Sequence, residues 1–235
     1  MKQALSILCF VLLAGSIATG CNSEDTDYTE ARRRMVYEQI VSRGVTDSAV
    51  VAAMLSVPRH EFVPADVRRH AYIDSPLPIG NDQTISQPYI VALMTASLGL
   101  GPGARVLEVG TGSGYQAAVL AEIADTVYTI EIIPPLADRA RSLLMRLGYR
   151  NVFVRAGDGY FGWPEQAPFD GVIVTAAAPK LPERLVEQLR MGGRLVIPVG
   201  KTFQNLEVYE KGPGGLTCLY TLPVRFVPMT GRIRE

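Results

Sequence analysis

The stretch VLEVGTGSGYQAAVLAEI, residues 106–123, decides the fold of this chain. Its first four residues, VLEV, are mostly aliphatic and are followed at once by glycine, which is the pattern of a buried strand. Gly110, Gly112 and Gly114 alternate with other residues before a helical apolar pattern that starts at Tyr115. Glycine costs backbone entropy, so three glycines in five positions indicate a tight turn that leaves room for a ligand. Strand, loop and helix together predict a nucleotide-cofactor cradle at the carboxyl edge of a parallel sheet.

The glycine spacing narrows the kind of cofactor. G-x-G-x-G is neither the dinucleotide fingerprint G-x-G-x-x-G nor a phosphate loop, which would continue with lysine. Glu131 ends the next apolar run, 21 positions after Gly110, where an acid can accept hydrogen bonds from ribose hydroxyls. The loop contains no lysine or arginine, which suits a cofactor without phosphates such as S-adenosylmethionine (SAM). The alternative is a glycine-rich turn that binds nothing.

Composition limits the class of protein. The chain has 235 residues, 48% of them hydrophobic, and a formal net charge of zero, which predicts one globular domain with a substantial core. Neutrality argues against a nucleic-acid partner, because non-specific nucleic-acid binding needs a basic surface. We expect a monomer, because the sequence contains no apolar stripe left for a subunit interface.

The first twenty residues differ from the rest of the chain. One positive charge precedes an apolar run that is too short to span a bilayer, which is the pattern of a secretory signal peptide over residues 1–20. The sequence ATGC that ends at Cys21 resembles the cleavage box of bacterial lipoproteins, so Cys21 is the predicted lipid site and the only predicted membrane attachment. Residues 21–29 are the predicted polar tether and residues 30–235 the predicted domain.

Two locations stay open on this basis. A lipid on Cys21 would place the protein in the periplasm, whereas SAM is made in the cytosol. The alternative is a cytoplasmic enzyme whose translation begins later, for instance at Met35.

Cysteine and histidine usage predicts no metal site. Only Cys218 lies in the predicted domain, so we expect neither an internal disulfide nor a cysteine-type metal site, and its apolar strand pattern predicts inert packing. His60 and His70 are the only histidines. His60-Glu61 does not begin the zinc motif H-E-x-x-H, because Pro64 occupies the second histidine position. Both histidines are therefore predicted to be structural.

The segment PLPIGNDQTISQP, residues 76–88, is rich in loop-forming residues and precedes a predicted helix over 89–98. Ser86 therefore has two interpretations. It can be the N-cap of that helix, a common position for serine. Alternatively, the loop lies over the cofactor and points the hydroxyls of Ser86 and Thr84 into the site.

The rest of the chain alternates strands with helices. The predicted strands cover residues 106–109, 127–131, 152–155, 169–175 and 194–199, and a hairpin joins 206–211 to 216–227. The predicted helices cover 30–43, 47–56, 89–98, 115–123, 135–147 and 183–189, the last of them ended by Gly192-Gly193. This order predicts an α/β fold with a doubly wound, mostly parallel sheet, an antiparallel C-terminal hairpin and extra N-terminal helices.

Two further strand ends carry candidate site residues. Asp158, between Gly157 and Gly159, can accept a hydrogen bond from an adenine amino group, or it can be a simple turn aspartate. Ala177, Ala178 and Pro179 are small residues that leave space where a substrate would meet a methyl donor.

Seven motifs, taken together, resemble one family. They are GNDQTISQP (80–88), VLEVGTGSGYQAAVLA (106–121), VYTIE (127–131), GDGY (157–160), FDGVIVTAAAP (169–179), GGRLVIPVG (192–200) and VRFVPMTG (224–231). In this order they are similar to the protein-L-isoaspartate O-methyltransferase family. The resemblance covers residues 30–231, and the loop through Ser86 and the tail at Val227 are its most specific parts.

The resemblance implies an activity and a set of site residues. It implies methyl transfer from SAM to the α-carboxyl of L-isoaspartyl residues in damaged proteins, with S-adenosylhomocysteine as product and repair through methyl ester and succinimide. Ser86 would occupy the catalytic position. The implied cofactor contacts are Gln83, Thr84, Ile85, Gly110, Gly112, Ser113, Glu131, Ile132, Gly157, Asp158 and Thr230. The implied substrate side is Ala177, Ala178, Pro179, Val227 and Pro228, together with Thr230.

Three other function classes share part of this pattern. A small-molecule or RNA methyltransferase would share the cradle, but RNA binding should show a basic stripe with aromatics, and the sequence has none. A serine hydrolase elbow G-x-S-x-G fails at Ser113, because Thr111 stands at its first glycine position. A non-catalytic SAM-binding protein anchored at a membrane stays open.

Overall fold

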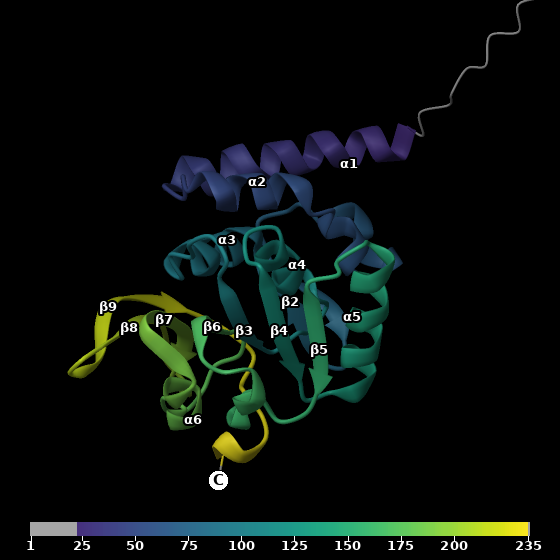
Figure 1. Cartoon of the computed structure of the whole chain (residues 1–235). Coiled ribbons are helices and arrows are strands. Elements are labelled where there is room, and N and C mark those ends of the chain that lie inside the picture. Colours follow the sequence, from purple (N-terminus) through teal and green to yellow (C-terminus); the bar gives the residue numbers. More distant parts are fainter. Residues whose placement is uncertain (1–22, 235) are drawn as a thin grey trace, which may run out of the picture.

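The computed structural model describes residues 23–234, so the predicted signal segment 1–20 and the predicted lipid site Cys21 lie outside the described residues. A seven-stranded sheet forms the centre, with the strand order β5-β4-β3-β6-β7-β8-β9 (Figure 1). Its strands are β3 Arg105–Val109, β4 Thr126–Glu131, β5 Val152–Ala156, β6 Phe169–Val174, β7 Leu189–Val199, β8 Gln204–Gly212 and β9 Gly215–Val224. Strands β3 to β7 pair in parallel, whereas β8 and β9 are antiparallel. The predicted fold class is confirmed.

Both faces of the sheet are covered, which explains the continuous apolar runs of its central strands. In β3, Val106 packs into one hydrophobic cluster and Leu107 and Val109 into the other. The first cluster lies under α2 to α5 and the N-terminal helices, and the second lies under α6 and the C-terminal turn η7 (Arg232–Arg234). The α-helices are α1 Ser23–Arg34, α2 Ser48–Ser56, α3 Pro88–Ser97, α4 Tyr115–Ala121, α5 Pro134–Arg146 and α6 Glu183–Glu187.

Short elements connect these layers. A separate hairpin consists of β1 Leu77–Gly80 and β2 Gln83–Ile85, directly before α3. The short helical turns are η1 Met35–Ile40, η2 Val41–Arg43, η3 Arg59–Phe62, η4 Ala65–His70, η5 Gly159–Phe161, η6 Pro164–Gln166 and η7 Arg232–Arg234. No helix within residues 23–234 is both long and apolar enough to cross a membrane.

The N-terminal helix begins earlier than predicted. It starts at Ser23 and continues through η1 and η2 to Gly44, whose φ of 91° ends it. The predicted tether over 21–29 is therefore helical from Ser23 onward. The sequence SEDTDYTEARRR puts acidic residues first and arginines last, the order that the helix dipole favours. The predicted cap of the next helix is confirmed, because the Asp47 carboxylate accepts hydrogen bonds from the N–H groups of Ala49 and Val50.

Two local predictions were wrong. Gly192-Gly193 does not end a helix but lies inside β7, because Leu189 already pairs with Phe169 of β6. The backbones approach closely there, since a Cβ on Gly193 would lie 2.9 Å from the Asp170 carbonyl oxygen. Cys218 is exposed rather than packed, because β9 is the edge strand of the sheet.

The structural interpretation of His60 is confirmed by its contacts. Its Nδ1 lies 2.7 Å from the Tyr72 hydroxyl, and its ring stacks on Tyr28 of α1 with centroids 4.2 Å apart. His70 accepts a hydrogen bond from the side chain of the neighbouring Arg69. Among residues 23–234, no group of three or more His, Cys, Asp or Glu side chains could hold a metal ion.

Candidate active site

The loop between β3 and α4 turns as its glycines predict. Gly110, Gly112 and Gly114 have φ values of 101°, 52° and 87°, which other residues rarely adopt. A Cβ on Gly110 would lie 2.4 Å from the Thr175 hydroxyl, so the β3–β6 contact also requires glycine there. The loop leaves backbone atoms at the carboxyl edge of the sheet with no side chain in front of them.

Glu131 is held against this loop. One carboxylate oxygen accepts a hydrogen bond from Gly112 N at 2.8 Å, and the other accepts one from Ile133 N at 2.9 Å. Only 5% of the residue is exposed. Each carboxylate oxygen can accept a further hydrogen bond, so Glu131 can still bind a pair of hydroxyls.

A cavity of about 240 Å³, the glycine-loop cavity, opens in front of Glu131. Predicted cofactor residues line it: Gln83, Thr84, Gly110, Gly112, Glu131, Ile132 and Thr230. Val227 and Pro228, predicted for the substrate side, close its other wall. No lysine or arginine within residues 23–234 lines this cavity, which agrees with the expected cofactor without phosphates.

A second cavity of about 780 Å³, the Ser86 groove, lies next to it. Ser86 lines this groove together with Arg225 and Phe226 of the segment that follows β9. Thr84, Thr175 and Val227 line both cavities, so the two meet at these three residues. Ser86 is not the N-cap of α3, because the cap position is Gln87. Ser86 is therefore available to face a ligand in the groove.

Three predicted substrate residues do not lie at this junction. Ala177 and Pro179 line a different cavity of about 530 Å³, on the other side of the segment 227–230. The Ala177 backbone is held against that segment, because its N–H donates to Val227 O and its carbonyl accepts from Met229 N. Ala178 is fully buried, so its side chain can only pack.

Two predicted cofactor residues are also placed elsewhere. The side chain of Ile85 belongs to the hydrophobic core. Ser113 lines a separate cavity of about 320 Å³ with Phe62 and Arg139, and its hydroxyl accepts a weak hydrogen bond from Tyr115 N at 3.3 Å. Successive side chains of a strand point to opposite faces, so in β2 the buried Ile85 points away from the exposed Thr84.

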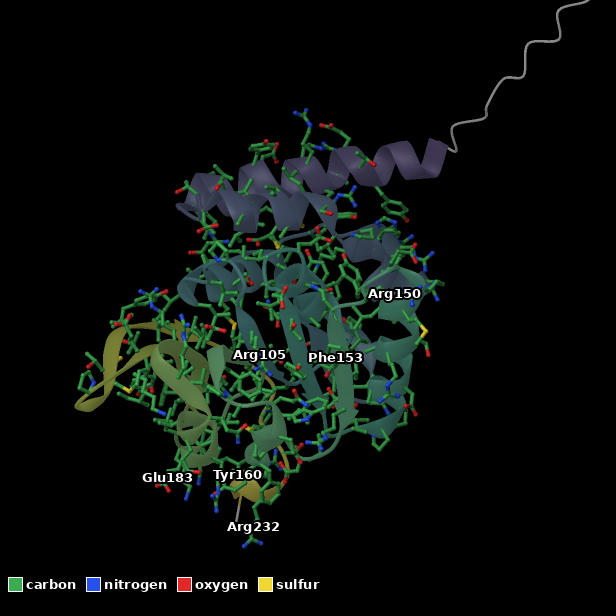
Figure 2. The ribbon with its side chains drawn as sticks, viewed as in Figure 1. Arg105, Arg150, Phe153, Tyr160, Glu183 and Arg232 are labelled. Atoms are coloured by element: carbon green, nitrogen blue, oxygen red, sulfur yellow. The ribbon has the colours of Figure 1, made fainter. Side chains whose placement is uncertain are left out.

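The Asp158 side chain is the N-cap of η5. Its carboxylate accepts hydrogen bonds from Tyr160 N at 2.9 Å and from Arg232 N at 2.7 Å. Tyr160 and Arg232 lie at the same end of the molecule in Figure 2. Gly157 is next to the site, because its N–H donates to the Glu131 carbonyl, but neither residue lines the glycine-loop cavity. The C-terminal turn, which covers Asp158, could not be anticipated from the local sequence.

A buried acid lies within the sheet near this loop. Glu108 of β3 is completely buried, and neither carboxyl oxygen has a partner at hydrogen-bond geometry among residues 23–234, although the Thr129 hydroxyl lies near. The pKa of Glu108 is raised to about 8, mainly by burial. The nearby Thr129 hydroxyl lowers this pKa in part, and the negative charge of Glu131 raises it. Glu108 is therefore largely protonated at neutral pH, and the Glu131 carboxylate is the acid that faces the cavity.

Sequence reasoning missed Thr175. This residue follows β6, lines both cavities, and donates its hydroxyl proton to Gly110 O at 2.6 Å. The available signal was a hydroxyl at the carboxyl end of a predicted strand, where ligand-binding residues gather in α/β sheets.

The comparisons with known proteins agree with this geometry. The family model described as protein-L-isoaspartate(D-aspartate) O-methyltransferase matches residues 30–234. This chain belongs to the protein-L-isoaspartate O-methyltransferase family. A member of the family from Opitutus terrae is 54% identical over 232 residues, which cover 98% of each chain. Another, from Gloeobacter violaceus, is 57% identical over 198 residues, which cover 83% of this chain and 97% of the relative. The predicted family is confirmed.

Solved structures extend the likeness to three dimensions. A protein-L-isoaspartate O-methyltransferase with 32% identity superposes with a TM-score of 0.80, covering 86% of this chain and 67% of the other. A family member from Plasmodium falciparum, solved with S-adenosyl-L-homocysteine, has 27% identity and a TM-score of 0.71, covering 86% of this chain and 98% of the other.

Proposed function

We propose that Ser86 orients the α-carboxylate of an L-isoaspartyl residue in the Ser86 groove toward a methyl donor in the glycine-loop cavity. As a member of its family, the protein is a SAM-dependent O-methyltransferase that acts on isoaspartyl residues in proteins. One observation carries the proposed role of Ser86: the groove that contains it and the glycine-loop cavity share Thr84, Thr175 and Val227. A carboxylate in the groove and a donor in the cavity would meet there.

The residues of the glycine-loop cavity fit SAM. Glu131 would accept hydrogen bonds from the two ribose hydroxyls, and the half-exposed Ile132 would give the adenine an apolar contact. Gly110 and Gly112 line the cavity without side chains of their own. SAM supplies an electrophilic methyl group on a positively charged sulfur, which needs no basic residue to bind it.

The proposed chemistry asks little of the protein beyond orientation. A carboxyl group of this kind has a pKa of about 3.9, so it is ionised at neutral pH and is already a nucleophile. The Ser86 hydroxyl would donate a hydrogen bond to one carboxylate oxygen and leave the other free to attack the methyl carbon. Holding reactants in line contributes on the order of 7–11 kcal/mol in favourable cases. Val227 and Pro228 would limit how the peptide enters.

A pair of synthetic peptides tests the substrate and the role of Ser86 together. We expect methyl incorporation into an isoaspartyl peptide but not into its aspartyl twin. Ser86→Ala should lower kcat/KM by about 10- to 100-fold, because one hydrogen bond to a charged group contributes about 1.5–3 kcal/mol. The Kd for S-adenosylhomocysteine, measured by calorimetry, should stay unchanged.

Ser142→Ala is the matched control, because Ser142 is an exposed serine on α5 that lines neither cavity. It should keep wild-type kcat/KM. Full activity of Ser86→Ala would remove Ser86 from the mechanism, and equal labelling of the two peptides would refute the substrate assignment.

We further propose that residues 1–20 are an export signal and that Cys21 carries a lipid. The sequence pattern supports this, and α1 lies across the sheet from the carboxyl edge, so an anchor at its start would leave the site facing away from the anchor (Figure 1). A start at Met35 would remove Tyr28, which stacks on His60. Mass spectrometry of the mature N-terminus distinguishes the two: diacylglyceryl-Cys21 supports export, and a start near Met35 refutes it and supports a cytoplasmic enzyme.

The proposed oligomeric state is a monomer. We propose it because the sequence contains no exposed apolar stripe that would form a subunit interface. Light scattering coupled to size exclusion measures this directly, and a stable dimer mass would contradict it.

A further inference from the structure

Arg59, the first residue of η3, is a fully buried cation. It forms no ion pair with any residue in the range 23–234. Burial lowers the pKa of Arg59, but a guanidinium stays protonated in proteins. Burying a charge without a counter-charge is costly, so stability alone does not explain an arginine at this position.

The contacts of Arg59 converge on the active site. Its Nη2 donates a 2.7 Å hydrogen bond to the backbone carbonyl of Ser86, and its Nε donates a 2.7 Å bond to the carbonyl of Ala71. The guanidinium also lies 4.8 Å from the ring centroid of Tyr115, the first residue of α4 after the glycine loop. Hydrogen bonds from a charged donor are about twice as strong as neutral ones. One side chain thus joins the Ser86 backbone to the helix that carries the glycine loop.

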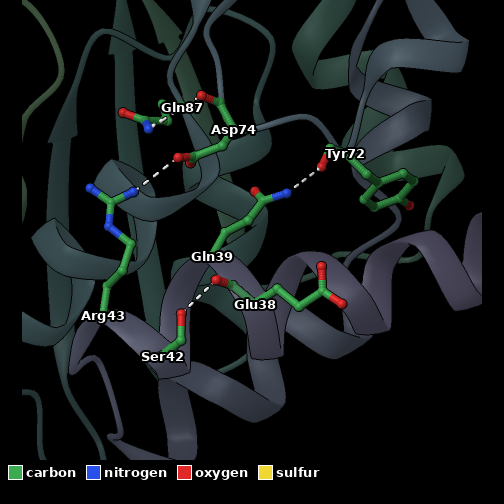
Figure 3. A network of polar contacts seen from close by, with 7 residues as sticks. All are labelled: Glu38, Gln39, Ser42, Arg43, Tyr72, Asp74 and Gln87. Carbon is green, nitrogen blue, oxygen red and sulfur yellow. Dashed lines mark hydrogen bonds and ion pairs between the residues drawn. The ribbon is translucent and has the colours of Figure 1, made fainter.

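The neighbouring residue Gln87 is held in a second way. Its side-chain amide donates to the Asp74 carbonyl at 3.3 Å, and the Asp74 carboxylate pairs with Arg43 at 3.0 Å. Gln39 of η1 donates to the Tyr72 carbonyl at 2.9 Å, so the segment 72–74 is tied to the N-terminal helices, as Figure 3 shows. The backbone at Ser86 and Gln87 is therefore anchored from two sides, by Arg59 and by this segment.

We propose that Arg59 is a positioning residue for Ser86. By fixing the Ser86 carbonyl, it sets the backbone direction from which the Ser86 hydroxyl reaches into the groove. This inference rests on the proposed role of Ser86. Without Arg59, the connection between β2 and α3 would sample other conformations, and small misplacements of orienting groups cost large factors in rate.

Arg59→Lys is the test variant. Lysine keeps the charge but, as a single ammonium, it cannot hold both carbonyls in the planar fork geometry of a guanidinium. We expect kcat/KM for the isoaspartyl peptide to fall by about tenfold or more, which corresponds to about 1.4 kcal/mol. The Kd for S-adenosylhomocysteine should stay within about twofold of the wild-type value, when both are measured well below the lower Tm. If Arg59→Lys does not fold, Arg59→Met is used in its place, because the methionine side chain leaves no buried charge.

Arg105→Lys is the matched control. Arg105 also donates to a backbone carbonyl, that of Gln166 at 2.8 Å, and lies 5.6 Å from the Tyr128 ring centroid. It starts β3 at the amino edge of the sheet and lines neither cavity. This variant should keep wild-type kcat/KM even where its Tm falls.

A double-mutant cycle with Ser86→Ala decides whether Arg59 acts through Ser86. In the Ser86→Ala background, Arg59→Lys should lower kcat/KM by less than about twofold, because the group it positions is gone. If the losses of kcat/KM caused by Arg59→Lys and Ser86→Ala multiply in the double variant, Arg59 does not act through Ser86. The inference about Arg59 also fails if Arg59→Lys keeps wild-type kcat/KM while Ser86→Ala is impaired. A fully active Ser86→Ala instead refutes the role of Ser86 on which the inference rests.

Discussion

Glu108 has a pKa far above the usual range of a glutamate. Burial raises its pKa to about 8 in the folded protein, whereas the ordinary value is 4.5. Between these pH values the unfolded chain releases the proton and the folded protein retains it. The unfolded state therefore binds fewer protons, and stability falls as pH rises from about 4.5 to about 8.

The variant Glu108→Gln should remove this pH dependence. We expect the free energy of unfolding of the wild type to fall relative to the variant by about 1.4 kcal/mol per pH unit between pH 5 and pH 8. Urea denaturation at several pH values measures the two curves. Parallel curves over this range would show that Glu108 is ionised in the folded protein.

The glycine loop shows how an element depends on one position. Gly110 has a φ of 101°, and the hydroxyl of Thr175 occupies the space where a Cβ would be. The single proton of the same hydroxyl is shared between the carbonyls of Gly110 at 2.6 Å and Val109 at 3.2 Å, so moving the hydroxyl would break its contacts with the end of β3. The loop shape and the β3–β6 contact are therefore one structural unit.

Gly110→Ala should damage both stability and cofactor binding. The left-handed backbone costs about 1–2 kcal/mol with a side chain, and the clash with Thr175 adds to this. Each kcal/mol lost from the free energy of unfolding lowers Tm by about 2–4 °C in a protein of this size. Gly101→Ala is the control, because Gly101 has no such φ and a Cβ there would meet nothing within 4 Å. Differential scanning fluorimetry with and without S-adenosylhomocysteine makes the comparison, and equal Tm values for both variants would contradict the argument.

At the scale of the whole molecule, α1 belongs to the folded domain. Tyr28 stacks on His60, and His60 in turn contacts Tyr72 of the segment that anchors Gln87. The boundary predicted at residue 30 therefore cuts through a helix that packs against the core. The N-terminal helices support the Ser86 loop as well as covering the sheet.

Tyr28→Ala should lower the stability of the whole domain. An aromatic pair contributes about 0.5–1.5 kcal/mol beyond its buried area, which predicts a Tm that is lower by several degrees. Tyr37→Ala is the control on the same helical run, because Tyr37 is 50% exposed. If Tyr37→Ala lowers Tm as much as Tyr28→Ala does, the packing of Tyr28 does not contribute specifically to stability.

Prediction succeeded where short-range physics decides the outcome. The order of strands and helices followed from apolar periodicity. The cap of α2 at Asp47 followed from the ability of a carboxylate to accept hydrogen bonds from nearby N–H groups. The turn at Gly110 followed from the freedom of glycine at positive φ. Glu131 was found because parallel strands end at one edge of a sheet, so an acid at a strand end faces that edge. The motifs around Ser86 and Val227 named the family.

Neighbouring residues and short motifs were therefore enough to predict the fold class, the family and the acid that faces the cavity. Folding of the whole chain determines which hydroxyls meet at the junction of the cavities, as with Thr175, and which residues are excluded from it, as with Ser113. It also brings the Asp158 carboxylate to Arg232 N, 74 positions away, and the Arg59 guanidinium to the Ser86 carbonyl. These bonds join segments far apart in the chain, so no local pattern specifies their partners.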